Sequence, residues 1–95
     1  MDIRRLTIGN YEINEEIIYR KVSDETVMAY NPENGDMYEL NDVSEEIIFM
    51  HRKRMSGDSM LVELSSTYDV DEQTIVEDVS PLLDRLIELG LLTLK

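Results

Sequence analysis

The sequence contains few residue types that can do chemistry, since it has a single histidine and no cysteine. Catalysis by acids, bases or nucleophiles needs converging groups with matched pKa values. His51 has no cysteine or second histidine to act with. It follows the apolar stripe of an expected helix, so we predict a partly exposed residue at the helix end, stabilised by the helix dipole. We expect that the chain is not an enzyme.

The 21 acidic side chains are scattered along the chain, mostly at expected helix starts and exposed positions. Asp69-x-Asp71-Glu72 is similar to a fragment of a calcium-binding loop, but the required glycine and the distal glutamate are absent. The four glycines stand singly and form no phosphate-binding motif. We therefore predict no metal ion and no cofactor.

The formal net charge is −12, and the only basic run is Arg52-Lys53-Arg54. The dipole of the helix that ends there explains this run. Nucleic acids bind cations and are repelled by an acidic surface, so we expect no nucleic-acid partner. The acidity itself indicates either solubility or a basic partner.

A chain of 95 residues makes one domain. The absence of cysteine favours a reducing compartment, and the start of the chain is not followed by an apolar core of signal-peptide length. No stretch approaches the roughly 20 apolar residues of a membrane span. We expect a cytoplasmic protein without a membrane partner.

Three segments have the β-branched and aromatic composition of strands: residues 17–22, 26–31 and 37–40. Asn34-Gly35 lies between the last two and tolerates the positive φ angles of a hairpin turn. Residues 1–16 are polar and irregular. We interpret them as an N-terminal arm or a short first strand that precedes a domain of residues 17–95.

After Leu40 the apolar residues follow a period of 3.6, which predicts three helices. Side chains that can accept the free amide hydrogens of the first turn precede each helix: Asn41 or Asp42, Asp58 or Ser59, and Asp71. Ser56-Gly57 is expected to end the first helix and Gly90 the third. Tyr68 is assigned to the buried face of the second helix, and residues 91–94 to a final extended segment over the core.

The third predicted helix has a wider apolar face than one core contact needs. At 100° per residue its apolar side chains span roughly 160°, against a stripe of about 100° for a helix on one core surface. They are Ile75, Val76, Val79, Leu82, Leu83, Leu86, Ile87 and Leu89. The surplus indicates a second apolar contact, or two neighbouring helices that share the arc. Pro81 predicts a kink or, alternatively, a break.

Three strands followed by three helices predict an α+β fold of the winged helix-turn-helix type with a three-stranded antiparallel sheet. The third strand, residues 37–40, has one charge and no proline to protect its edge. Such an edge suits an incoming extended peptide whose backbone completes the ladder. The alternative is an edge covered by the chain's own N-terminal arm.

Several features follow one another in a specific order: a hairpin over 28–40, a helix entry at Leu40-Asn41 and 44–47, then Leu64 with 68–70, and finally Asp78-Val79, Leu82-Leu83, Leu86 and 90–92. In this order they resemble the PqqD family, named for pyrroloquinoline quinone biosynthesis. Its members are also called RiPP recognition elements, where RiPP means a ribosomally synthesised and post-translationally modified peptide. The resemblance covers the chain from Ile17 onward.

The resemblance implies that the chain binds the leader segment of a ribosomally synthesised precursor peptide. The leader would pair with the third strand, in the groove between that strand and the third helix. It would be delivered to a modifying enzyme, such as a radical S-adenosylmethionine (SAM) enzyme, a cyclase or a protease. The expected peptide-binding residues are Met37, Tyr38, Glu39, Leu40, Asp78, Val79, Leu82, Arg85 and Leu86.

Two other functions stay open. One is a winged-helix DNA-binding regulator, although the third helix carries five acids against Arg85. The other is a structural subunit that dimerises through its edge strand, so the chain is expected to be a monomer or a homodimer.

Overall fold

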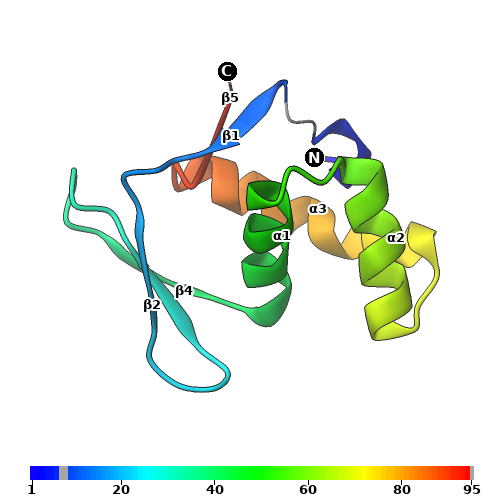
Figure 1. Ribbon diagram of the computed structural model, residues 1–95, viewed down its shortest axis with the longest axis horizontal. Helices are drawn as coiled ribbons and strands as arrows, with labels where there is room; N and C mark the ends of the chain where they lie inside the picture. The colour runs from blue at the N-terminus through cyan, green and yellow to red at the C-terminus, as the bar shows by residue number, and fades with distance from the viewer. Residues whose placement is uncertain (7–8, 95) are drawn as a thin grey trace.

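A computed structural model describes residues 1–6 and 9–94 as a three-stranded sheet beside three helices (Figure 1). The predicted α+β fold class, with a winged-helix order of elements, is confirmed. Thr7 and Ile8 of the predicted N-terminal segment, and Lys95 at the other end, lie outside the described residues.

The three-stranded sheet consists of β2 (Ile18–Lys21), β3 (Val27–Tyr30) and β4 (Met37–Leu40) in the order β2-β3-β4, with both pairs antiparallel. Its buried side chains, Val27, Ala29 and Leu40, lie on one face and belong to the core. Gly35 has a φ of 78° in the β3–β4 turn, which a glycine adopts without strain. The three predicted strands are confirmed.

The N-terminal segment contains a 3-10 helix η1 (Ile3–Arg5) and a strand β1 (Tyr11–Ile13). Of the two interpretations of this segment, the short strand is present. β1 pairs antiparallel with β5 (Leu92–Leu94) in a separate two-stranded sheet, so the described residues of the segment do not cover β4. Ile3 and Leu6 are fully buried, which the polar composition around them did not indicate.

Helix α1 (Asp42–Arg52) is capped by Asn41, whose side chain accepts a hydrogen bond from the Ser44 amide at 2.8 Å. The prediction that Ser56-Gly57 ends this helix is wrong. The helix ends at Arg52, and Arg54 turns the chain with a φ of 65°. The amide of Met55 then donates to the Met50 carbonyl at 3.1 Å, which satisfies a free carbonyl of the last turn.

Helix α2 (Gly57–Tyr68) is capped by Ser56, so the predicted caps Asp58 and Ser59 are wrong. Gly57 is the first residue of α2, and its role is close packing. A Cβ at this position would lie 1.9 Å from the backbone oxygen of Ile3. The Gly57 amide donates to the Leu6 carbonyl at 2.8 Å, so the N-terminal segment is fixed to the start of α2.

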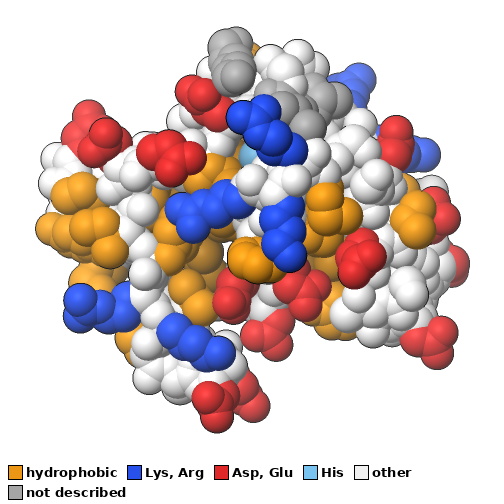
Figure 2. Space-filling model, in the orientation of Figure 1, with side chains coloured by type: hydrophobic (Ala, Val, Ile, Leu, Met, Phe, Trp, Pro, Cys, Tyr) orange, Lys and Arg blue, Asp and Glu red, His pale blue; other side chains and the backbone are white. Residues whose placement is uncertain are grey.

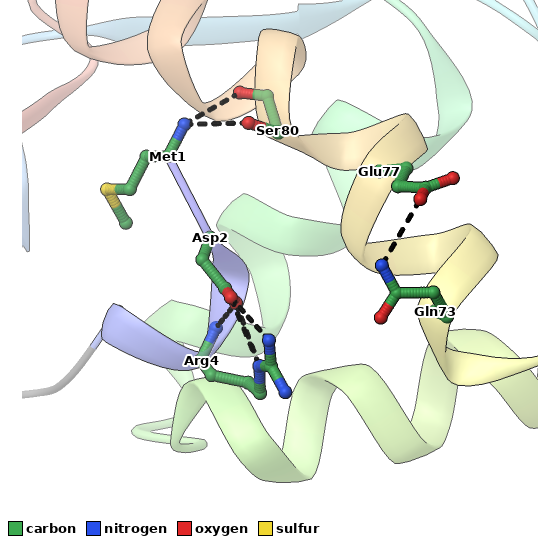
Figure 3. A network of polar contacts seen from close by, with 6 residues as sticks. All are labelled: Met1, Asp2, Arg4, Gln73, Glu77 and Ser80. Atoms are coloured by element: carbon green, nitrogen blue, oxygen red, sulfur yellow. Dashed lines mark hydrogen bonds and ion pairs between the residues drawn. The ribbon is translucent and has the colours of Figure 1, made fainter.

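Helix α3 (Glu72–Glu88) is capped by Asp71 and runs without interruption through Pro81, which excludes the alternative of a break at this proline. Gly90, with a φ of 78°, follows its end as predicted. The amino group of Met1 donates to Ser80 Oγ at 2.8 Å (Figure 3). At 100° per residue, Ser80 lies on the side of α3 opposite to Leu82, so this contact leaves the Leu82 side free.

Two predicted exposures are wrong. His51 is buried at 7% exposure, because β1 packs on the end of α1 and the Tyr11 carbonyl lies 3.0 Å from His51 Nε2. Tyr68 is 39% exposed, because it is the last residue of α2 and extends beyond the core. Within residues 1–6 and 9–94, no helix is both long and apolar enough to cross a membrane.

Candidate functional site

A groove with a volume of about 340 Å³ lies between β4 and α3. Its lining comes from β4, from the first turn of α1 and from one side of α3. The lining residues are Met37, Tyr38, Glu39, Leu40, Asn41, Ser44, Leu82, Arg85, Leu86 and Leu89. An edge strand and a partly apolar helix therefore form the two walls of one groove.

The hydrogen-bond pattern of the ladder determines which backbone groups of β4 face this open edge. The amide of Asn31 donates to the Asp36 carbonyl at 2.9 Å, next to the β3–β4 ladder. Bonded pairs alternate along an antiparallel ladder, so Tyr38 also bonds to β3. The amides and carbonyls of Met37 and Glu39 point the other way. β4 is the last strand of its sheet among the described residues, so these groups face the open side.

The apolar arc of α3 divides between the core and the groove. Its buried members pack in the core: Ile75, Val79, Leu83 and Leu86. Leu82 and Leu89 are only partly buried and line the groove together with Leu86. The arc is wider than one core contact requires because α3 serves two surfaces.

The rim of the groove is polar around Tyr38 and Arg85. The Tyr38 hydroxyl donates to Asp36 Oδ2 at 3.1 Å. Desolvation, with a further contribution from the hydrogen bond to the Asp36 carboxylate, raises the pKa of Tyr38 above its ordinary value. Arg85 is 62% exposed and lies 3.8 Å from Glu88, a distance that leaves the guanidinium free to meet another anion.

Seven of the nine predicted site residues line the groove, since Asp78 and Val79 are not among its lining residues. Asp78 is exposed on the same side of α3, one turn nearer to the helix start, and Val79 is buried in the core. Three further residues line the groove that were not predicted as site residues: Asn41, Ser44 and Leu89. The spacing of Leu89 from Leu82, seven residues along a helix, was the available signal for the last of these.

The described residues form no cluster of metal-binding side chains. No three of their His, Cys, Asp or Glu side chains lie close enough together to hold a metal ion. His51 Nε2 is taken up by the Tyr11 carbonyl, and its Nδ1 is buried without a partner. The geometry of the groove is that of a binding surface with an open strand beside apolar side chains.

Comparisons with known proteins point to the same fold. A solved structure described as TbiB1 in complex with the TbiA(beta) leader peptide matches with a TM-score of 0.75 at 20% identity. The match covers 85% of this chain and 93% of the other chain. The comparison with curated proteins found no match. Residues 26–92, from the start of the β3 segment to β5, match the family described as Coenzyme PQQ synthesis protein D (PqqD). This chain belongs to the PqqD family.

Proposed function

We propose that this protein binds the leader segment of a ribosomally synthesised precursor peptide as an added strand on β4. The observation that carries the proposal is the open β4 edge next to an apolar groove. An incoming strand gains main-chain hydrogen bonds from such an edge and inserts alternate side chains into the groove. The fold shared with TbiB1, whose structure is described as a complex with a leader peptide, supports this function.

The leader would hydrogen-bond to Met37 and Glu39, the residues whose amides and carbonyls face outward. An apolar leader side chain would pack against Leu82, Leu86 and Leu40. Anchors of this kind provide most of the affinity of a small interface. Arg85 lies at the rim, where charge sets specificity and association rate more than affinity. Asp78, one turn away, would meet a residue further along the leader.

In this proposal the protein is an accessory module without catalysis. Binding the leader holds the rest of the precursor near a modifying enzyme, which raises the local concentration of the substrate. The enzyme would be a radical SAM enzyme, a cyclase or a protease. The net charge of −12 and the acidic α3 disfavour the alternative of a DNA-binding regulator.

The deciding experiment is a calorimetric titration of the protein with the leader of a short precursor peptide encoded beside its gene. Leu82→Asp should lower the affinity by about thirty-fold, because burial of a leucine contributes about 2 kcal/mol. Ile87→Asp is the matched control, since Ile87 is a partly buried residue of α3 outside the groove.

Hydrogen exchange gives a second measurement that does not depend on a variant. The leader should protect the outward amides of Met37 and Glu39, whereas Tyr38 already bonds to β3 and should change little. Protection of other residues only, or equal affinity for Leu82→Asp and wild type, would contradict the proposed groove. A concentration-dependent dimer with the same protected amides would favour the dimerising subunit instead.

A further inference from the structure

A second cleft, with a volume of about 240 Å³, lies on the other side of α1, between α1 and β2. Its lining combines aromatic and aliphatic side chains with cations: Tyr19, Lys21, Val27, Leu40, Glu45, Ile48, Phe49 and Arg52. Figure 2 shows Lys and Arg side chains gathered on the face that carries β2 and the end of α1, with hydrophobic side chains between them. We call this region the β2–α1 cleft.

The aromatic rings of the β2–α1 cleft are covered by cations. The guanidinium of Arg52 lies 4.9 Å from the centre of the Tyr19 ring, and Lys53 Nζ lies 4.4 Å from the centre of the Phe49 ring. Phe49 is nevertheless 58% exposed. A large exposed ring beside cations has the composition of a contact surface for a partner that brings both apolar and acidic groups.

The edge of β2 is also open. The amide of Val22 donates to the Thr26 carbonyl at 3.0 Å, so by alternation Arg20 bonds to β3 and the backbone groups of Tyr19 and Lys21 face outward. β2 is the other terminal strand of its sheet among residues 1–6 and 9–94. Arg20 and Lys21 place positive charge on this edge, which repels a second copy of itself but not an acidic strand.

The charge of the whole molecule narrows the class of partner. At a net charge of −12, the long-range field repels nucleic acids and anionic membranes. A short acidic segment brings only a few charges and meets the local cations of β2 and of the end of α1. Glu45 is the one acid in the lining, at the far end of the helix from Arg52. Charge complementarity therefore favours a protein segment over a polyanion.

We infer that the β2–α1 cleft docks an extended acidic segment of a partner protein. The segment pairs with the outward backbone groups of β2. Its carboxylates meet Lys21 and Arg52, and an apolar side chain packs on Phe49. This site does not depend on the proposed leader groove. The two sites share Leu40 in their linings but use opposite edges of the sheet, so the protein can hold a leader on β4 and a partner on β2 at the same time.

The test uses the full chain and a fluorescent synthetic peptide in which glutamate alternates with leucine, followed by anisotropy at low salt. Phe49→Ala and Arg52→Glu should each weaken binding by roughly tenfold. Val62→Ala is the matched control for Phe49, because Val62 on α2 is also 58% exposed. Arg5→Glu is the control for charge, since Arg5 is an exposed cation outside the cleft. A lysine–leucine peptide can be attracted by the net charge of −12, but its binding should not depend on Phe49 or Arg52.

Hydrogen exchange should show new protection at Tyr19 and Lys21, the outward amides of β2. The inference is overturned if the acidic peptide does not bind, if Phe49→Ala and Arg52→Glu bind as wild type does, or if anionic vesicles or duplex DNA bind through these same residues. Leu82→Asp should leave binding of the acidic peptide intact. If this variant lost binding of the acidic peptide, the leader and the acidic peptide would share a single site. If the leader did not bind but the acidic peptide still did, only the proposed leader function would be wrong.

Discussion

The two edges of the three-stranded sheet have the same backbone geometry but different surroundings. In each edge strand, the amides and carbonyls of two residues point outward. These residues are Tyr19 and Lys21 on β2, and Met37 and Glu39 on β4. Beside β4 stands α3 with partly buried leucines, whereas beside β2 stands the cationic end of α1.

The tyrosines on the two edges show the same difference in detail. Tyr19 and Tyr38 both lie opposite Ala29 in the ladder, one on each neighbouring strand. The Tyr19 hydroxyl is buried without a partner under Arg52, and the Tyr38 hydroxyl donates to Asp36 at the surface. Two tyrosines on the same face of the sheet thus acquire different properties from the helix that packs beside each of them. In the two proposals above, the helices beside the edges, and not the strands, would therefore decide which peptide segment each edge binds.

Proline substitutions should produce the largest effects, because they separate inward from outward amides. Tyr38→Pro removes a ladder bond to β3 and should lower the thermal midpoint by roughly 8 °C or more. Glu39→Pro removes an outward donor, so the midpoint should stay close to wild type while leader affinity falls about fivefold. Thermal unfolding and calorimetry together measure both. Equal destabilisation by the two variants would mean that the assigned alternation is wrong.

The same substitution on the opposite edge sharpens the comparison. Lys21→Pro should leave leader binding unchanged and weaken binding of the glutamate–leucine peptide, since Lys21 directs its amide away from β3. If Lys21→Pro weakened binding of the leader instead, the leader would pair with β2 and not with β4.

Reversal of a rim charge should have a smaller effect. Arg85→Glu should change leader affinity by only about two- to fivefold, because Arg85 is 62% exposed and solvent screens its interactions. Most of the change should appear in the association rate and should shrink as salt is raised. Stopped-flow measurements at two salt concentrations test this, with Arg5→Glu as a control on an unrelated surface. A loss that persists at high salt would place Arg85 in the centre of the interface.

The smallest effect concerns pH. Burial disfavours the charged phenolate and raises the pKa of Tyr19 from 10.0 to about 12. The folded state therefore keeps a proton that the unfolded state releases, so this stabilisation is present below pH 10 and is lost as the pH rises through 12. Absorbance titration should show Tyr19 among the last tyrosines to ionise. Tyr19→Phe should remove part of the fall in stability above pH 10, and an unchanged profile would contradict a buried phenol.

Much of the fold could be predicted because local signals agreed with it. The cap Asp71, the stop at Gly90 and the Asn34-Gly35 turn each act within a few residues, and the structure confirms the helix and strands that they delimit. The N-terminal cap of α2 was harder to predict. Ser56, Asp58 and Ser59 are all good capping residues, and packing of Gly57 on η1 selected Ser56.

The candidate site was predictable only in part. The strand of residues 37–40, which has one charge and no proline, and the wide apolar arc of α3 are visible in the sequence, and both features line the groove. The arc did not reveal that Val79 lies in the core while Leu82 and Leu89 remain at the groove. That division depends on where β4 crosses α3, which no local pattern encodes.

The sequence by itself determined the kind and order of the elements, because periodicity, caps and turns are properties of neighbouring residues. The tertiary structure decided which surfaces those elements bury. It placed β1 against β5 and so left β4 open, and it buried His51 beneath Tyr11, a residue 40 positions away. Burial and strand pairing depend on contacts between distant segments, and a contact of that kind has no signature in the residues next to it.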